Sequence, residues 1–187
     1  MEQRFNTYTI DLDLTPLKDY CIRHGELKKF SRGDFFETEG ISSHWIGYVI
    51  KGCFKYVVQN KAEGKDYITG FAFNEEFVDD FPNCISHQPA TVSIVAMSHA
   101  EVYVMDGTEL SNALKEHDMG QIYRHLFGQI YSQYLDSYRM TPKGRYIYLL
   151  RRCPQIVQQI NLKDIASFLR VTPTTISNIR RGITFTE

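Results

Sequence analysis

The spacing of apolar residues changes once along this chain, near Gly107, and that change constrains the fold more than any other feature. Before it, a short helix at 17–24, with Thr15-Pro16 as its N-cap and first position, is followed by short runs of aromatic and β-branched residues that alternate with turn signals. Among these signals, Lys51-Gly52-Cys53 predicts a tight hairpin. After it, apolar residues recur at helical spacing. Strands followed by helices predict an α+β fold, in which an antiparallel sandwich or barrel precedes a helical region.

The longest predicted helix spans 118–139 and carries two apolar stripes. One stripe consists of Tyr123, Phe127, Ile130, Tyr134 and Tyr138. A helix that is apolar on two sides has to be covered on two sides, so one face can pack on its own barrel while the other needs a partner helix. This predicts a two-fold homodimer, and a single helix buried within a monomer is the alternative. We expect the dimer interface on the second stripe, which contains Met119, Ile122, Leu126, Gln129 and Gln133.

A cap-and-turn pattern occurs twice near the end of the chain and predicts two short helices. Asn161 is a good N-cap for the first, and Thr172-Pro173 provides a cap and first-turn pair for the second. We expect the second helix to end at Gly182 and to cross the first where the small Ala166 lies. Two short helices joined by a three-residue turn form a helix-turn-helix.

The outward face of the second of these helices is polar and basic. Side chains of these types contact base edges and phosphates in DNA complexes. The expected DNA contacts are Thr174, Thr175, Ser177, Asn178, Arg180 and Arg181, together with the neighbouring Lys163. Residues 139–187 carry nine basic and two acidic residues, whereas the rest of the chain carries 12 basic and 20 acidic ones. This distribution favours a nucleic-acid module, and a structural helical hairpin with solvated side chains is the alternative.

Other classes of protein find no support in the sequence. The four cysteines form no Cys-x-x-Cys pair, and His87 and His99 do not have the spacing of a barrel metal site, so no metal is predicted. Nucleophile, phosphate-loop and dinucleotide motifs are missing, and we expect neither catalytic residues nor a cofactor. No apolar run approaches the roughly 20 residues that span a bilayer, and no signal-peptide core is found. We therefore expect a cytoplasmic protein without membrane contact.

Taken together, these patterns resemble the Crp/Fnr superfamily of bacterial transcription regulators, and in particular its compact members. The resemblance covers residues 10–182 and is most specific in TPKGRYIYLLRRCPQIV and INLKDIASFLRVTPTTISNIRR. It implies an N-terminal cyclic-nucleotide-binding-like β-roll, of the double-stranded β-helix or jelly-roll kind, at 1–117. A dimerisation helix at 118–139 and a helix-turn-helix domain at 140–187 would follow. The implied partners are double-stranded DNA, a second copy of the chain, RNA polymerase and a small-molecule effector.

Departures from the family pattern in the roll disfavour cyclic AMP as the effector. In nucleotide-binding members a Gly-Glu pair and an Arg-Ser/Thr pair hold the ribose and phosphate, and the alignment places Asp79-Asp80 and Ala90-Thr91 there. The arginine is thus replaced, and loss of such a charge-assisted contact costs about 1.5–3 kcal/mol. The other pocket candidates, Phe71 and Phe73 with neighbouring aromatic residues, leave two occupants open: an apolar ligand or the protein's own side chains.

Departures in the DNA module concern Arg170, Asn178 and the wing. Arg170 replaces a turn glycine, and a left-handed conformation there costs about 1 kcal/mol. Asn178 replaces an arginine and would prefer adenine to guanine. Residues 182–187 are too few for the wing hairpin of larger relatives. The expected function is a dimeric DNA-binding transcription regulator, and the alternative is a dimeric small-molecule sensor or protein-interaction module that has lost DNA binding.

Overall fold

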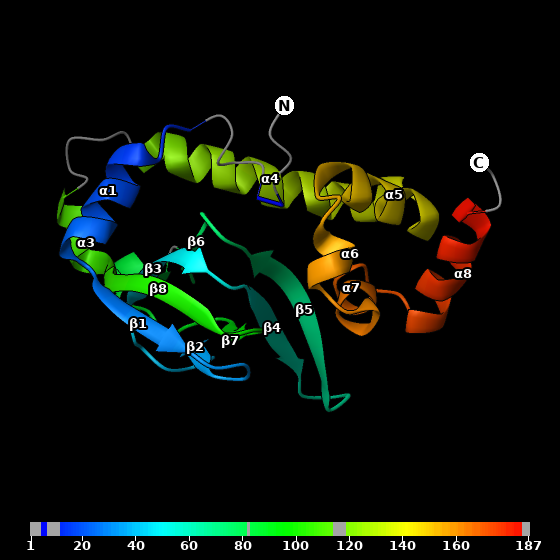
Figure 1. The fold of residues 1–187 in the computed structure, drawn as a ribbon, viewed down its shortest axis with the longest axis horizontal. Coiled ribbons are helices and arrows are strands. Elements are labelled where there is room, and N and C mark those ends of the chain that lie inside the picture. The colour runs from blue at the N-terminus through cyan, green and yellow to red at the C-terminus, as the bar shows by residue number, and fades with distance from the viewer. Residues whose placement is uncertain (1–4, 7–11, 82, 114–118, 185–187) are drawn as a thin grey trace. The chain divides into compact units, whose positions relative to one another are not determined.

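Two four-stranded antiparallel sheets make up the strand-rich part of the computed structural model, which describes residues 5–6, 12–81, 83–113 and 119–184 (Figure 1). The first sheet has the strand order β1-β8-β3-β6 and the second β2-β7-β4-β5. The strands are β1 (Glu26–Phe30), β2 (Phe35–Glu37), β3 (Trp45–Lys51), β4 (Phe54–Asn60), β5 (Lys65–Ala72), β6 (Phe77–Asp79), β7 (Ser93–Ala96) and β8 (Ala100–Asp106). The predicted α+β class and the antiparallel β-roll are thereby confirmed.

One core cluster joins the two sheets. It includes Val49 and Val102 from the first sheet and Phe54 and Ile94 from the second, all four fully shielded from solvent. A second cluster lies where α1 (Thr15–His24) and α3 (Gly107–Ala113) meet the first sheet, and it contains Cys21. Burial of these apolar faces supplies the main driving force for folding the roll.

The segment Lys51-Gly52-Cys53 does not form the hairpin predicted for it. β3 pairs with β6 and β8, whereas β4 belongs to the other sheet and pairs with β5 and β7. Gly52 has a φ of 96°, and a Cβ atom there would lie 2.6 Å from the backbone oxygen of His99. Only glycine fits this crossing from one sheet to the other, and a local turn signal cannot distinguish a crossing from a hairpin.

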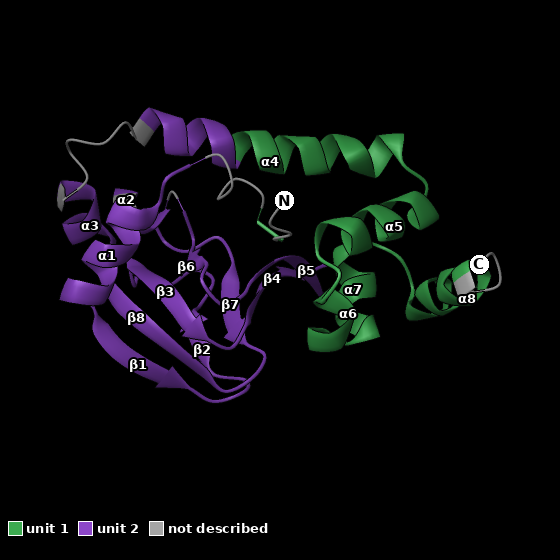
Figure 2. Cartoon of the chain, turned by 45° about the horizontal axis from the view of Figure 1, so that its top comes forward, with its two compact units in different colours: residues 1–7, 127–187 green, residues 8–126 purple. Residues whose placement is uncertain are grey.

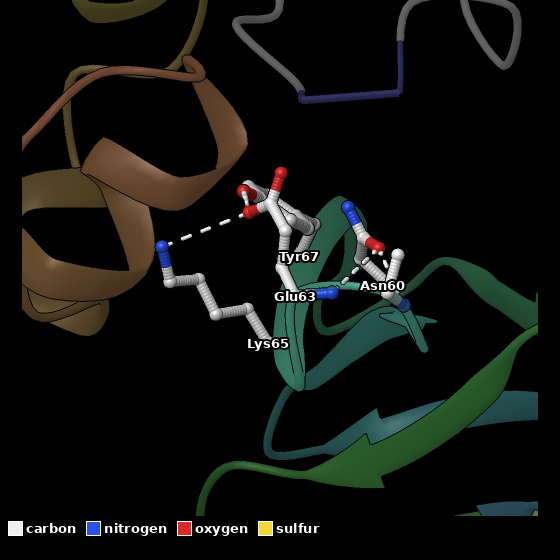
Figure 3. Close-up of polar contacts among 5 residues, drawn as sticks. Asn60, Glu63, Lys65 and Tyr67 are labelled. Carbon is white, nitrogen blue, oxygen red and sulfur yellow. Dashed lines mark hydrogen bonds and ion pairs between the residues drawn. The ribbon is translucent and has the colours of Figure 1, made fainter.

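The turn between β4 and β5 is held by its own polar side chains (Figure 3). Asn60 Oδ1 accepts hydrogen bonds from the backbone N–H groups of Ala62 and Glu63, at 3.1 and 3.2 Å. The Glu63 carboxylate in turn accepts the Tyr67 hydroxyl at 2.8 Å and lies 3.6 Å from the Lys65 ammonium. This network fixes the register of the longest pair of neighbouring strands.

The helices predicted at 118–139 and in the helix-turn-helix are present as α4 (Met119–Arg139), α7 (Leu162–Phe168) and α8 (Pro173–Thr184). Between α4 and α7 lie α5 (Pro142–Arg152) and α6 (Ile156–Gln159). α8 continues through Gly182 instead of ending there, and Leu14 rather than Thr15 is the N-cap of α1. The short elements β6 and α2 (Asn83–Ser86) were not predicted. Three or four residues carry too little periodicity to be recognised from sequence.

The chain divides into two compact units, residues 8–126 and residues 1–7 with 127–187 (Figure 2). Phe5 therefore belongs to the helical unit, although sequence reasoning placed residues 1–117 together. Its ring is 3% exposed, lies 5.4 Å from the Phe168 ring and sits 4.7 Å from the Arg152 guanidinium carbon. The partition into sensor, dimerisation and DNA-binding regions stays a prediction.

Candidate nucleic-acid interface

The helix-turn-helix is built around α7 and α8. Asn161 caps α7 as expected: its Oδ1 accepts the Asp164 N–H at 2.9 Å, and its Nδ2 donates to the Asp164 carboxylate at 2.8 Å. Thr172 begins α8 in the same way, because its Oγ1 accepts the Thr175 N–H at 3.1 Å. These caps satisfy backbone N–H groups that the first turn of a helix leaves without a partner.

A small apolar core fixes the angle between the two helices. Ile165 and Ala166 of α7 and Ile176 of α8 are completely buried. The turn between the helices passes through Arg170, whose φ of 55° confirms the left-handed conformation considered from the sequence. The Val171 N–H donates to the Ala166 carbonyl at 2.9 Å, which completes the turn. The local geometry therefore compensates for the strain of a non-glycine residue at this position.

Opposite this core, α8 presents the side chains that the sequence singled out. Thr174, Asn178, Arg180 and Arg181 are exposed, whereas Thr175 and Ser177 are half-buried. Arg181 Nη2 donates to Asn178 Oδ1 at 2.5 Å, so the guanidinium orients the amide. The Thr175 hydroxyl lies 2.9 Å from the Thr172 hydroxyl and is engaged in the helix cap. Lys163 is exposed on the first turn of α7.

The two stripes of α4 differ in exposure. The exposed set, which we call the aromatic face, comprises Tyr123, Phe127, Ile130, Tyr131, Tyr134 and Tyr138. Within it, the Phe127 and Tyr131 rings stack at 5.6 Å. Of the stripe on which we expected the dimer interface, Ile122, Leu126, Gln129 and Gln133 are half-buried, and the Met119 side chain lies outside the described residues. Gln129 Nε2 also donates to Asn6 Oδ1 at 3.3 Å.

In the roll, the structure brings together two segments that the family alignment singled out. Asp80, 8% exposed, accepts the Thr91 N–H at 2.5 Å and the Thr91 hydroxyl at 3.1 Å. Asn83 Nδ2 donates to the same carboxylate oxygen at 3.1 Å. Ala90 is buried between backbone hydrogen bonds to residues 40 and 41. The Asp80 carboxylate thus accepts the hydrogen bonds that an anionic ligand would need.

The remaining pocket candidates are buried. Phe71 and Phe73 are 1% and 9% exposed, and their rings lie 6.1 Å apart.

Burial raises the pKa of Asp79 to about 7, and the neighbouring Asp80 charge adds to this effect. Burial also raises the pKa of Glu37, whose carboxylate accepts the Ser43 hydroxyl. Sequence reasoning missed Asn83, Glu37 and Ser43, since no motif spacing marks them.

The structure indicates no other kind of chemistry in the residues it describes. Among them, no three His, Cys, Asp or Glu side chains are grouped so that they could bind a metal ion. All four cysteines are buried free thiols. None of the described helices combines the length and the hydropathy that crossing a bilayer requires.

Several solved structures share this architecture. FixK2 from Bradyrhizobium japonicum has a TM-score of 0.69 at 14% identity, over 87% of this chain and 85% of that one. The c-di-GMP responsive global regulator CLP of Xanthomonas campestris has a TM-score of 0.64 at 12% identity, over 93% of both chains. TTHB099, a CRP-family transcriptional regulator from Thermus thermophilus, has a TM-score of 0.62 at 13% identity, over 85% of both.

The chain has the Crp/Fnr fold. No family model and no curated protein sequence matches it. The resemblance seen in the sequence is therefore confirmed at the level of architecture, and CLP and TTHB099 are regulators. The Crp/Fnr fold accounts for the order of the parts, with the roll first, the long α4 next and the helix-turn-helix last.

Proposed function

We propose that this protein is a transcription regulator that binds double-stranded DNA through α8. The observation that carries the proposal is the polar and basic outward face of α8, held over a fully buried helix-turn-helix core. Thr174 and Asn178 would contact base edges, while Arg180, Arg181, Ser177 and Lys163 would hold phosphates. Thr175 would contribute its methyl group, because its hydroxyl is paired with that of Thr172.

A homodimer is part of the proposal, and the exposed aromatic face of α4 supports it. A contiguous apolar surface of this kind is typical of an interface. Two-fold pairing along α4 would place two α8 helices in successive major grooves, about 34 Å apart. We therefore propose the aromatic face as the interface, with the half-buried stripe around Gln133 as the alternative.

The roll would act without cyclic AMP. The Asp80 carboxylate already accepts the Thr91 and Asn83 donors, and a phosphate would have to displace it against charge repulsion. An effector of another kind would shift the population of DNA-competent dimers by binding one arrangement of the roll better than the other. RNA polymerase remains a proposed partner on the strength of the fold.

Selection of bound duplexes from random DNA tests the main proposal. The wild-type chain should enrich a two-fold symmetric site, and R180A/R181A should enrich none. R151A is the matched control, because Arg151 is an exposed arginine on α5 and not on α8. A wild-type chain that forms dimers but enriches no site would instead support the sensor or protein-interaction module.

Sedimentation velocity tests the dimer and its face together. Tyr134→Arg should convert the dimer to a monomer, because it places a charge within the aromatic face. Gln133→Arg, on the half-buried stripe, should leave the dimer intact. The opposite result would move the interface to the stripe around Gln133, and a monomeric wild-type chain would overturn the dimer.

A further inference from the structure

Arg145 makes three hydrogen bonds to main-chain carbonyls at the ends of two helices. It lies half-buried in the first turn of α5. Its Nη1 donates to the carbonyls of Ser137 at 3.1 Å and Met140 at 2.9 Å, where α4 ends. Its Nη2 donates to the carbonyl of Leu169 at 3.1 Å, where α7 ends. One side chain therefore joins the end of the long helix to the end of the first helix of the helix-turn-helix.

The chemistry of these contacts suits arginine and no other residue. The last carbonyls of a helix have no partner within the helix and carry its negative dipole end, so a cation that donates to them is favoured. A guanidinium presents donors in a rigid plane and can serve two carbonyl groups in different directions, whereas a lysine ammonium is a single flexible point. These three hydrogen bonds all go to carbonyls, so they fix direction rather than neutralise a carboxylate.

The position of the third carbonyl gives the contact its consequence. Leu169 directly precedes Arg170, the left-handed residue from which the chain turns into α8. A bond to the Leu169 carbonyl therefore holds the start of the turn that aims α8. The other two bonds hold the end of α4, and all of these segments belong to the same compact unit.

We propose that Arg145 is a positioning residue that sets the direction of α8 relative to α4. This inference rests on the proposed function, since α4 would carry the two-fold axis and α8 would enter the DNA. Arg145 then determines which spacing between two half-sites the dimer accepts. It would touch no DNA itself.

Binding to duplexes with different half-site spacings tests this role. The probes carry either one selected half-site or two, with centre-to-centre spacings that vary in steps of one base pair around about 10 base pairs. Wild type should prefer one spacing at least tenfold. Arg145→Met should bind the single half-site within about twofold of wild type, yet lose most of that preference. Arg151→Met, an exposed arginine on the same helix, should behave as wild type.

Two other results on DNA would overturn the inference. Equal losses on single and paired half-sites would show that Arg145 only supports the folded helix-turn-helix, and an unchanged spacing preference would show that it positions nothing. Should Arg145→Met fail to fold, Arg145→Lys keeps the charge and most of the stem. It should still flatten the spacing preference, because it cannot serve both helix ends at once.

Amide hydrogen exchange on the DNA-free protein separates failure of the inference from failure of the proposed function. Arg145→Met should exchange faster than wild type in both 136–145 and 166–172, and Arg151→Met in neither. That paired change supports the positioning contact even for a chain that binds no duplex. Unchanged exchange in 166–172 would overturn it, whatever the DNA results are.

Discussion

The polar residues of the roll and those of α8 are used in opposite ways. In the roll, Asp80, Asn83 and Thr91 bind one another, and Asp80 is 8% exposed. On α8, Asn178 and Arg181 bind each other as well, but both are exposed. The first network is satisfied inside the fold, while the second is presented outside it. Changes in the roll should therefore alter stability, and changes on α8 should alter binding.

The largest expected effect concerns Phe5, which is buried in the helical unit. Phe5→Ala should lower the free energy of unfolding of the helical unit by about 3–5 kcal/mol, because it empties a buried ring site between Phe168 and Arg152. Urea denaturation followed by circular dichroism measures it. Phe35→Ala, at a ring that is 57% exposed on β2, is the control and should cost much less. Equal costs would contradict the burial of the Phe5 ring.

Removing the Asp80 carboxylate from the roll should lower stability without changing the affinity for DNA. Asp80→Ala removes the acceptor of the Thr91 N–H and one of the two acceptors of the Asn83 amide, at a cost of about 1–3 kcal/mol. Urea midpoints and duplex affinity are measured on the same samples. Asp66→Ala, at an exposed carboxylate on β5, should change neither. A change in duplex affinity with Asp80→Ala would show that the roll network is coupled to α8.

Replacing the exposed amide of Asn178 should alter DNA binding without altering stability. Asn178→Ala should reduce discrimination at one base position by about 1–3 kcal/mol and leave the urea midpoint unchanged. Competition assays with single-base variants of the selected site measure the discrimination. Uniform weakening on every sequence would assign Asn178 to phosphate contact instead.

The pH dependence of stability should come from the roll. Burial raises the pKa of Asp79 to about 7, above its unfolded value near 3.8, so the folded chain holds that proton more tightly. The resulting stabilisation is complete below about pH 4 and is lost as the pH rises through 7. Asp79→Asn should flatten the decline between pH 4 and 7 in urea titrations. An unchanged profile in Asp79→Asn would assign the decline to Glu37 or another group.

The smallest expected effect is electrostatic. Arg181→Ala should weaken binding to all duplexes and reduce the slope of log affinity against log salt by about 1, through loss of one phosphate contact. Affinities measured at several salt concentrations give the slope, and R151A is again the control. An unchanged slope would limit Arg181 to orienting Asn178, which it contacts in the structure.

Local signals predicted the helical half well. Thr141 caps α5 through its bond from the Gly144 N–H, and Asn161 caps α7, as the residue types indicate. The Gly52 turn was misjudged because a tight turn looks the same whether the next strand joins the same sheet or the other. Gly182 does not end α8, since an isolated glycine is tolerated within a helix whose apolar face is packed.

The candidate site was also predicted only in part, because only some of its features depend on residues that are close together in the sequence. The exposed residues of α8 follow from helical periodicity, which is local. The exposed stripe of α4 did not follow, because both stripes are apolar in sequence and only packing selects the one that is covered. Arg145 was not predicted either, because an arginine eight residues after Ser137 matches no motif.

By itself, the sequence determined most of the segments that become strands or helices, where α8 begins and which side of α8 is polar. These properties depend on residues within one or two turns of each other. Tertiary structure alone decided that Asp80 binds Thr91, that Phe5 packs on Phe168 and that Arg145 joins two helix ends. Contacts between residues distant in the chain form only where burial of the core makes up for the chain entropy of bringing them together.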